Sequence, residues 1–413
     1  MLGQGALVAI IIGFPGAIQG RDVHQALRSM QKIKNPVAHI GIIGGGQLGR
    51  MMAIAARRLG CAVSVIDPTP DSPAGQVADQ QIVAAFDDHA AMRSLVEACD
   101  VTTFEIETID VSDLVALEQA GHAIHPSPSL LATLQDKLTQ KQLLQEAGLP
   151  TAEFIDAAEL TPETFSRFGY PLVQKARKGG YDGRGVAVLG SVEEFSRHLP
   201  VPSYIERFVA AEKELSVLVA RARDGSHRCY PVVEMKVHRE HNVLDVLVAP
   251  AHIGDEIALS AKEIAKRAID AMDGVGVFGV EMFLTAEGEI LINEIAPRTH
   301  NSGHHTIEAC VTDQFEQHLR AVMGLPLGAI DQMSPAAMLN LLGAPGSEGP
   351  VKVSGLAEAL LIHGVSVHRY GKAETRPWRK MGHATILNQN LEIAEQIADK
   401  LREILTISGE REL

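Results

Sequence analysis

The sequence predicts a mixed α/β and α+β protein: an N-terminal domain built on a parallel sheet, a larger central domain, and a small β-rich C-terminal domain. Apolar runs alternate with helical segments up to about residue 135, which is the pattern of β-α-β units. From Thr151 short strands predominate, joined by turns rich in Gly, Asp and Pro. Residues 331–390 return to strands, and a segment with amphipathic helical spacing follows.

Changes in composition place the expected boundaries. The expected segments are an extension (1–36), a parallel-sheet domain (37–135), a central domain (136–330), a small β-rich domain (331–392) and an amphipathic tail (393–413). The extension is apolar but too short to span a bilayer, and no Lys or Arg precedes Arg21, so we expect neither a membrane span nor a secretory signal. It is expected to be poorly ordered, or to precede a true start at Met30.

Charge and cysteine usage narrow the class of function. The chain carries 37 Lys and Arg against 51 Asp and Glu, a net charge of −14, which argues against nucleic acid or an anionic membrane as the partner. Small anionic substrates stay compatible with this charge, since they need only a local basic pocket. The four cysteines lie far apart, which predicts free thiols in a reducing cytoplasm rather than disulfides or a zinc site.

A glycine-rich turn follows the first predicted strand, residues 38–43, and opens a helix. Its glycines are spaced Gly44-x-Gly46-x-x-Gly49, and Asp67 ends the next strand, which together form the fingerprint of a dinucleotide-binding turn. The same turn could bind another phosphate at the helix N-terminus, or could be purely structural. The motif by itself leaves these three interpretations open.

Two glutamates in a predicted hairpin form the strongest candidate site. Two apolar strands flank a turn at Glu287-Gly288, and a two-residue turn there places Glu281 directly opposite Glu294. Facing side chains have Cβ atoms about 5 Å apart, so two carboxylates in apolar strands would repel each other unless a cation lies between them. Mg²⁺ suits such a pair, and Asn293 offers a further oxygen. The alternative is a pair of exposed glutamates on a solvated edge.

Two further segments carry phosphate-binding chemistry. After the hairpin, Arg298, His300 and His304 crowd into one loop, where a guanidinium beside bound Mg²⁺ could hold phosphoryl oxygens. The histidine spacing matches no standard zinc site. The segment 175–185 joins two strands with glycines and basic residues, which predicts a mobile loop that folds over a nucleotide; no helix follows, so it is not a Walker A loop. A plain surface loop is the alternative for both segments.

The chain resembles the ATP-grasp superfamily and, more closely, the PurK family, the N5-carboxyaminoimidazole ribonucleotide synthases of purine biosynthesis. The resemblance runs from about Ile40 to His383 and rests on an ordered set of motifs: GGGQLGRM, DPTPDSPAGQVAD, FEIE, QDKLTQK, GGYDGRG, NEIAPRTHNSGH and YGKAETRPWRKMGH. It implies an ATP-grasp fold with a Rossmann-like, pre-ATP-grasp N-terminal domain that uses no nicotinamide. Trp378 departs from the small residue that is more typical of the RPGRK segment.

The resemblance implies roles for individual residues. The implied ATP contacts are Lys137, Lys175, Gly179, Gly180, Tyr181, Asp182, Gly183, Arg184, Gly185, the hinge residues Glu206, Arg207, Phe208 and Val209, the ribose-binding Glu214, and His238, Asn293 and Glu294. The spacing in EMKVH, around His238, departs from the usual pattern. The implied Mg²⁺ ligands are Glu281 and Glu294. The implied contacts of the acceptor ribonucleotide are Gly46, Gln47, Leu48, Tyr181, Arg184, Lys372 and Arg379, and the implied catalytic residues are Arg298, Asp182 and Lys372.

The implied activity is the ATP- and bicarbonate-dependent carboxylation of 5-aminoimidazole ribonucleotide through carboxyphosphate. Mg²⁺ is the implied metal, for which Mn²⁺ can substitute, and a cytoplasmic homodimer with small-molecule substrates is the implied form. Three rivals stay open: a formate-using glycinamide ribonucleotide transformylase of the same superfamily, a nicotinamide-dependent dehydrogenase using residues 44–49 and Asp67, and a non-catalytic partner protein. The dehydrogenase leaves the Glu281–Glu294 pair unexplained.

Overall fold

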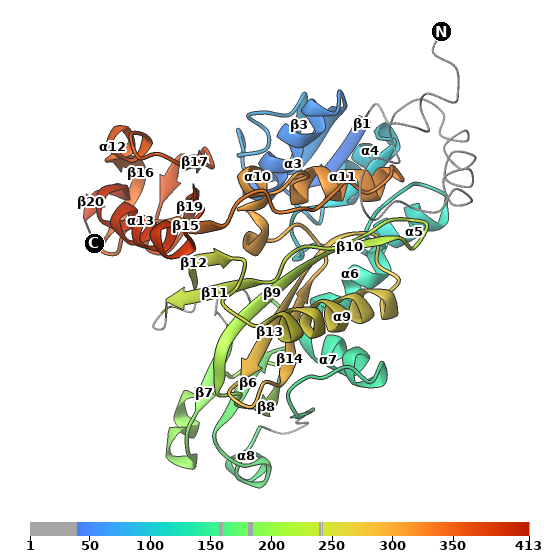
Figure 1. The fold of residues 1–413 in the computed structure, drawn as a ribbon. Coiled ribbons are helices and arrows are strands. Elements are labelled where there is room, and N and C mark those ends of the chain that lie inside the picture. Colours follow the sequence, from blue (N-terminus) through green and yellow to red (C-terminus); the bar gives the residue numbers. More distant parts are fainter. Residues whose placement is uncertain (1–38, 157–159, 181–184, 239–240, 242, 413) are drawn as a thin grey trace, which may run out of the picture. The chain divides into compact units, whose positions relative to one another are not determined.

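The computed structural model of the protein describes residues 39–156, 160–180, 185–238, 241 and 243–412 (Figure 1). The predicted extension, residues 1–36, lies outside the described residues. Within the described ranges, no helix is both long enough and apolar enough to cross a membrane. The strands of this part of the chain form four sheets.

The N-terminal sheet is parallel, with the strand order β3-β2-β1-β4. Its strands are β1 (His39–Ile43), β2 (Ala62–Asp67), β3 (Gln80–Val83) and β4 (Val101–Phe104), and its helices are α3 (Gln47–Arg58), α4 (His89–Ala98), α5 (Ser112–Gln119) and α6 (Pro128–Gln135). β1 and β2 are almost wholly buried, which is why they read as continuous apolar runs. The predicted β-α-β pattern is confirmed. Because the carboxyl ends of parallel strands meet at one edge, the residues after β4 lie beside the N-terminus of α3.

A small antiparallel sheet opens the central domain, with the strand order β5-β8-β6-β7. Its elements are α7 (Lys137–Glu146), β5 (Phe154–Ile155), α8 (Pro162–Phe168), β6 (Leu172–Ala176), β7 (Val186–Leu189), the 3₁₀ helix η1 (Val192–Arg197) and β8 (Ser203–Arg207). Phe165, Leu172, Leu189 and Ile205 form its buried core. An antiparallel sheet that packs a helix on one apolar face can carry polar residues on its other face.

A nine-stranded sheet runs through the central domain, in the order β14-β13-β9-β11-β12-β15-β19-β17, with β10 paired to β9. Its elements are β9 (Ala211–Arg221), β10 (His227–Cys229), β11 (Val233–His238), β12 (Val243–Ala249), α9 (Asp255–Ala271), β13 (Gly276–Thr285), β14 (Ile290–Ala296), β15 (Ala336–Leu342), β17 (Val365–Arg369) and β19 (Lys380–Leu387). The helix α9 lies along β9 and β13 (Figure 1) and packs buried alanines against their apolar side chains. The sheet continues across residue 331, where we expected a domain boundary, because β12 pairs with β15.

The segment after β14 connects the domains. It contains the 3₁₀ helix η2 (Asn301–Gly303), α10 (Thr306–Ala309) and α11 (Gln314–Met323). On α11, His318 Nδ1 accepts a hydrogen bond from the Val277 N–H (3.0 Å), and its Nε2 lies 2.7 Å from Thr103 Oγ1. Because Thr103 belongs to β4 and Val277 to β13, this buried histidine joins the N-terminal sheet to the nine-stranded sheet.

The C-terminal elements form a three-stranded sheet and two helices. They are β16 (Ser347–Ser354), α12 (Leu356–Leu360), β18 (Glu374–Thr375), α13 (Leu391–Ile404) and β20 (Thr406–Glu412), with the strand order β18-β16-β20. The expected amphipathic tail therefore divides into two parts. Its first part is α13, which buries Ala394, Ala398 and Leu401, and residues 406–412 form a strand that pairs with β16. This strand was not predicted, because its sequence, TISGERE, has little apolar alternation.

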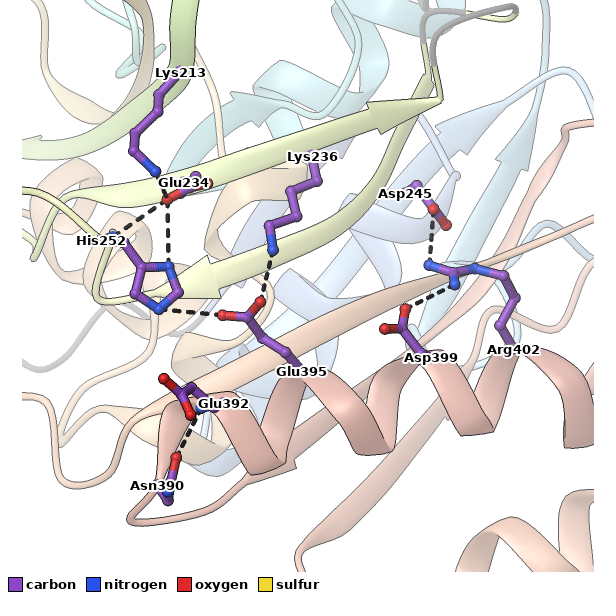
Figure 2. A network of polar contacts seen from close by, with 10 residues as sticks. All are labelled: Lys213, Glu234, Lys236, Asp245, His252, Asn390, Glu392, Glu395, Asp399 and Arg402. Atoms are coloured by element: carbon purple, nitrogen blue, oxygen red, sulfur yellow. Dashed lines mark hydrogen bonds and ion pairs between the residues drawn. The ribbon is translucent and has the colours of Figure 1, made fainter.

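Charged side chains attach α13 to β11, to β12 and to the segment after β12 (Figure 2). Glu395 contacts Lys236 Nζ (2.6 Å) and His252 Nε2 (3.3 Å), and Arg402 pairs with Asp245 (2.8 Å). The C-terminal helix is thus attached to the nine-stranded sheet by apolar packing on one face and by ion pairs on the other.

Candidate active site

The predicted pair of glutamates is present in the β13–β14 hairpin, where Glu281 lies directly opposite Glu294. The turn differs from the prediction. The Thr285 N–H donates to the Glu289 carbonyl (2.9 Å) and Gly288 has a φ of 85°, so three residues rather than two close the hairpin. A β-bulge at Asn293 then shifts the register by one residue and restores the predicted pairing.

The two facing carboxylates differ in their electrostatic state. Burial opposes ionisation of Glu294, but the Lys137 ammonium forms an ion pair with it and lowers its pKa. For Glu281, burial and then the charges of Glu294 and Glu214 raise the pKa to about 7. Glu281 therefore lacks a full counter-charge. A divalent cation between the two carboxylates would supply that charge.

The donor set at this hairpin fits Mg²⁺. It consists of two carboxylates, which are the hard oxygen ligands that this ion prefers. Among the described residues, no group of three or more His, Cys, Asp or Glu side chains is arranged to hold a metal ion. A cation at Glu281 and Glu294 would therefore need oxygens from elsewhere, and the phosphates of a nucleotide are the usual source.

His300 lies against β13 and directs one ring nitrogen at Glu281, with Nε2 3.4 Å from Oε1. Its Nδ1 accepts a hydrogen bond from the Ser302 N–H (3.3 Å). Burial, and then the charge of Arg298, lowers the pKa of His300 well below its usual range, so the ring is neutral. A neutral ring whose Nδ1 is an acceptor carries its proton on Nε2, so His300 presents an N–H to the Glu281 carboxylate.

Arg298 forms an ion pair with Glu107, with Nε 2.9 Å from Oε1. Glu107 follows β4 in the N-terminal domain, so this pair joins that domain to the loop after β14. Glu107 also lines a cavity of about 240 Å³ together with Lys137, Glu294 and the backbone of residues 179–180. Glu107 is the last residue of the FEIE motif, and no role was predicted for it. Its position at the carboxyl end of a parallel strand was the available signal.

Three predicted nucleotide-site residues meet in a buried polar cluster under the hairpin. Lys175 Nζ lies 2.6 Å from Glu206 Oε1 and donates to Asn293 Oδ1 (2.8 Å). The other Glu206 oxygen lies 3.0 Å from Lys141 Nζ, a buried ammonium that the prediction missed. Burial lowers the pKa of Lys141 to about 8, although Glu206 opposes the shift. Lys141 lies four residues after Lys137 on one face of α7, and that spacing was the signal in the sequence.

Of the predicted hinge residues 206–209, only Glu206 belongs to this polar cluster; Arg207 ends β8 and the next two residues follow the strand. Successive strand residues point to opposite faces, so Arg207 points away from Glu206 and pairs with Glu153 (3.1 Å). Phe208 is exposed, and its N–H donates to the Pro171 carbonyl (3.4 Å). Glu214 lies in β9, where burial raises its pKa and the positive charge of Lys175 opposes the shift. Glu214 is therefore close enough to the Lys175–Glu206 cluster to interact with it electrostatically.

Two of the predicted acceptor-side residues, Lys372 and Arg379, lie in the loops before and after β18. Lys372 Nζ donates to the Lys380 carbonyl (2.7 Å) and lies 5.7 Å from the centre of the Tyr370 ring. Arg379 donates to the Glu374 carbonyl (2.6 Å), and burial lowers its pKa. Four predicted residues, Tyr181, Asp182, Gly183 and Arg184, lie outside the described residues. Their neighbours Gly179, Gly180 and Gly185 border a cavity of about 570 Å³ with Arg177 and Lys178.

His238 ends β11, where its ring packs on that of Trp378, with centroids 4.8 Å apart. Its Nδ1 is buried and has no hydrogen-bond partner among the described residues. The nucleotide-side histidine predicted from the sequence is thus in contact with the acceptor-side segment that contains Arg379.

The first glycine turn is filled by a side chain of the protein itself. The Glu105 carboxylate accepts hydrogen bonds from the N–H groups of Gly46 (2.7 Å), Leu48 (3.1 Å) and Gly49 (3.1 Å) at the start of α3. A Cβ at Gly46 would lie 2.4 Å from Glu105 Oε1, and one at Gly44 would lie 2.4 Å from Glu105 Cγ. The glycines are therefore needed to admit Glu105.

The acidic residue of the dinucleotide fingerprint, Asp67, is also used internally. Asp67 accepts hydrogen bonds from the N–H groups of Gly45 (2.8 Å) and Thr69 (2.8 Å). With a carboxylate already at the helix N-terminus and Asp67 engaged with the backbone, a pyrophosphate would meet negative charge and no free N–H donors at Gly46, Leu48 and Gly49. The dehydrogenase interpretation is not supported. Any contact of Gly46, Gln47 and Leu48 with a substrate depends on groups other than the N–H donors of Gly46 and Leu48.

Three family models match successive segments of the chain. The ribonucleotide synthetase pre-ATP-grasp domain matches residues 37–135, the ATP-grasp domain matches residues 142–315, and the phosphoribosylaminoimidazole carboxylase C-terminal domain matches residues 336–397. An N5-carboxyaminoimidazole ribonucleotide synthase of Synechococcus elongatus is 43% identical over 363 residues, which cover 85% of this chain and 90% of the relative.

Solved structures agree with the sequence comparison. The N5-carboxyaminoimidazole ribonucleotide synthetase of Thermotoga maritima is 50% identical, with a TM-score of 0.85 over 90% of this chain and all of that chain. The synthase of Aspergillus clavatus in complex with ADP and 5-aminoimidazole ribonucleotide is 35% identical, with a TM-score of 0.82 over 89% of this chain and 98% of that one. The chain belongs to the N5-carboxyaminoimidazole ribonucleotide synthase family of ATP-grasp enzymes.

Proposed function

We propose that the protein carboxylates 5-aminoimidazole ribonucleotide to N5-carboxyaminoimidazole ribonucleotide, with consumption of ATP and bicarbonate, in purine biosynthesis. One observation carries the proposal: Glu281 and Glu294 face each other beside Lys137, in a chain whose relatives are synthases of this type. Facing carboxylates with one matched ammonium retain an excess of negative charge, which suits a metal-nucleotide complex.

In the proposed reaction a bicarbonate oxygen attacks the γ-phosphorus of ATP, and ADP leaves. The resulting carboxyphosphate breaks down to phosphate and CO₂, and the exocyclic amine of the ribonucleotide attacks the CO₂ carbon and loses a proton. Mg²⁺, held by Glu281 and Glu294, would neutralise charge on the nucleotide phosphates. Lys175 and Arg298 would stabilise the charge on the transferred phosphoryl group. His300 would hold Glu281 in position through its Nε2–H.

The nucleotide would lie over the cluster that contains Lys175, with its adenine at the hinge residues 206–209 and its ribose at Glu214. Lys137 would contact the phosphates, since it borders the same cavity as Gly179 and Gly180. The loop 179–185 would cover the phosphates and keep water from carboxyphosphate, which is the usual role of a closing glycine loop. His238 and Asn293 complete the proposed nucleotide side.

The acceptor would lie between the glycine turn and the segment that contains Lys372 and Arg379. Arg379, Tyr181 and Arg184 would bind the ribonucleotide, whereas Asp182 and Lys372 would orient its amine and accept the proton. The Lys372 charge already acts on Glu105, beside the glycine turn, which supports an acceptor between these two segments.

Location and assembly belong to the proposal as well. We infer a cytoplasmic enzyme, and the four cysteines, which form no disulfide within the described residues, are consistent with a reducing compartment. A homodimer is inferred from the family alone. Small molecules are the proposed partners, and the net charge of −14 supports this.

The deciding experiment measures ADP release from Mg·ATP and bicarbonate, with and without 5-aminoimidazole ribonucleotide. We expect strong stimulation by the ribonucleotide, with an absolute requirement for bicarbonate. Glycinamide ribonucleotide with formate is the control acceptor. Stimulation by that pair alone would reassign the chain to the formyl-transferring relatives, and no stimulation by either would reject the proposed reaction.

A further inference from the structure

Trp378 has a backbone conformation that its side chain disfavours. Its φ is 66°, in the left-handed region. The other described non-glycine residues with positive φ are Asp71 and Asp273, and aspartate tolerates this region because its short polar side chain can hydrogen-bond locally. A bulky residue there is an outlier that the surrounding structure must stabilise, and such outliers concentrate at functional sites.

The Trp378 ring is held by two histidines. It stacks on His241, with centroids 3.8 Å apart and planes 29° apart, and it packs on His238 at 4.8 Å. The Trp378 N–H donates to the Gly343 carbonyl (2.9 Å), which fixes the backbone. The ring is partly exposed, so filling of the apolar core does not explain its position.

The ring lies between residues of the two proposed substrate sides. On one side, His238 ends β11, the strand that also pairs Met235 with Glu214 of the proposed ribose site. On the other side, Trp378 directly precedes Arg379 and is two residues from Lys380, whose carbonyl accepts a hydrogen bond from Lys372. A movement of His238 on nucleotide binding would therefore be passed by direct ring contact to the segment that contains the proposed acceptor residues.

We propose that Trp378 is a positioning residue that couples nucleotide binding to acceptor binding through its contact with His238. The inference rests on the proposed function, because it takes His238 as nucleotide-side and Arg379 as acceptor-side. The left-handed backbone at position 378 turns the ring toward the histidines. The stacking contacts offset the conformational cost, since an aromatic pair is stabilising beyond its buried area.

Trp378 is the single tryptophan of the chain, so fluorescence excited beyond the tyrosine absorption band reports on this ring alone. The full-length protein is titrated with Mg·ADP, and binding is measured in parallel by calorimetry. We expect a saturable change in emission whose midpoint matches the calorimetric Kd. Calorimetric binding without any change in emission would overturn the coupling. Absence of ADP binding would instead reject the proposed function.

Two substitutions separate the ring from the backbone. Trp378→Gly suits a positive φ but removes the ring, and we expect the KM for the acceptor ribonucleotide to rise about 3- to 10-fold at saturating ATP, with kcat within about twofold. Trp378→Phe keeps a ring and is expected to recover most of this loss. Asp273→Gly, at another positive-φ position, is the matched control and should leave the acceptor KM unchanged.

Two results would reject the inference: an unchanged acceptor KM in Trp378→Gly, or an equal loss in the Gly and Phe variants. If Trp378→Gly does not fold, the fluorescence titration still decides, because Mg·ADP binding without any change in tryptophan emission would reject the coupling.

Discussion

Two carboxylate sites in this protein, the glycine turn and the β13–β14 hairpin, differ in how their charge is satisfied. At the glycine turn, one carboxylate, Glu105, accepts three backbone hydrogen bonds at a helix N-terminus. At the hairpin, Glu281 and Glu294 face each other, and the Lys137 ammonium forms its ion pair with Glu294, while the pKa of Glu281 stays raised. The same functional group is thus satisfied by the fold in one place and left in conflict in the other.

The difference separates structural from functional acidic residues. A carboxylate with enough internal donors stabilises the fold and has little left to offer a ligand. A carboxylate left with an excess of like charge destabilises the free protein and gains when a cation binds. Substitutions should therefore reduce stability at satisfied sites and reduce activity at conflicted ones, which is the usual trade between stability and function.

The largest expected effect on stability concerns Glu206, a carboxylate matched by two ammonium groups. Glu206→Gln removes the charge that Lys141 and Lys175 share, and so takes from two buried ammonium groups the carboxylate that both contact. We expect a loss of about 3–5 kcal/mol in the free energy of unfolding, measured by urea denaturation. Glu348→Gln, at an exposed pair with Arg411, is the control. A loss below about 1 kcal/mol would show that the cluster is not a fully matched site.

The hairpin should respond in the opposite way. Glu294→Gln removes a proposed metal ligand together with half of the repulsion at Glu281, so we expect kcat to fall about 100- to 1,000-fold. The midpoint of thermal unfolding of the free protein should change little, because lost repulsion at Glu281 offsets the lost ion pair with Lys137. Glu97→Gln, on the exposed side of α4, serves as the control. Wild-type turnover in Glu294→Gln would remove this residue from the metal site.

Both the fold class and the facing glutamates were predictable from the sequence, but for the hairpin the reason was partly wrong. The prediction assumed a two-residue turn, whereas the structure has a three-residue turn and a bulge at Asn293, and the two differences cancel. A bulge depends on how the hairpin packs against β9 and on the contact of Asn293 with Lys175, and neither can be read from local sequence.

Residues that act through distant partners were harder to predict. The dinucleotide fingerprint is intact as a pattern, yet Glu105, about 60 residues along the chain from the turn, occupies it. Lys141 and Glu107 were missed for the same reason, since their partners Glu206 and Arg298 come from other elements. Tertiary contacts decide which residues of a motif can still bind a ligand. Such contacts cannot be predicted from hydrophobic periodicity, because periodicity describes one helix or strand at a time.

A smaller effect on stability is expected from His318, a buried histidine whose hydrogen bonds are lost when acid protonates the ring. Burial, and then the neighbouring His125, lowers the pKa of His318 to about 3, and both ring nitrogens have partners. The unfolded chain binds this proton near pH 6.5, so the stabilisation is complete above that pH and is lost progressively as the pH falls toward 3. We expect a loss of about 2 kcal/mol at pH 5 from this residue. His318→Gln should reduce the slope of unfolding free energy between pH 6.5 and 5, and an unchanged slope would contradict the assignment.

The smallest effect is expected at the surface ion pairs that hold α13 (Figure 2), which belong to neither class of buried site. The Lys236 side chain is 45% exposed, so water screens its pair with Glu395. Lys236→Met should cost less than about 1 kcal/mol in urea denaturation, and the difference from the wild type should shrink further at high salt. His252 also contacts Glu395, so the helix keeps a polar anchor when Lys236 is lost. The contradicting result is a loss as large as that of Glu206→Gln that salt does not reduce. It would mean that the ion pairs of α13 behave like a buried charge cluster, and that surface and buried ion pairs in this protein do not differ in their contribution to stability.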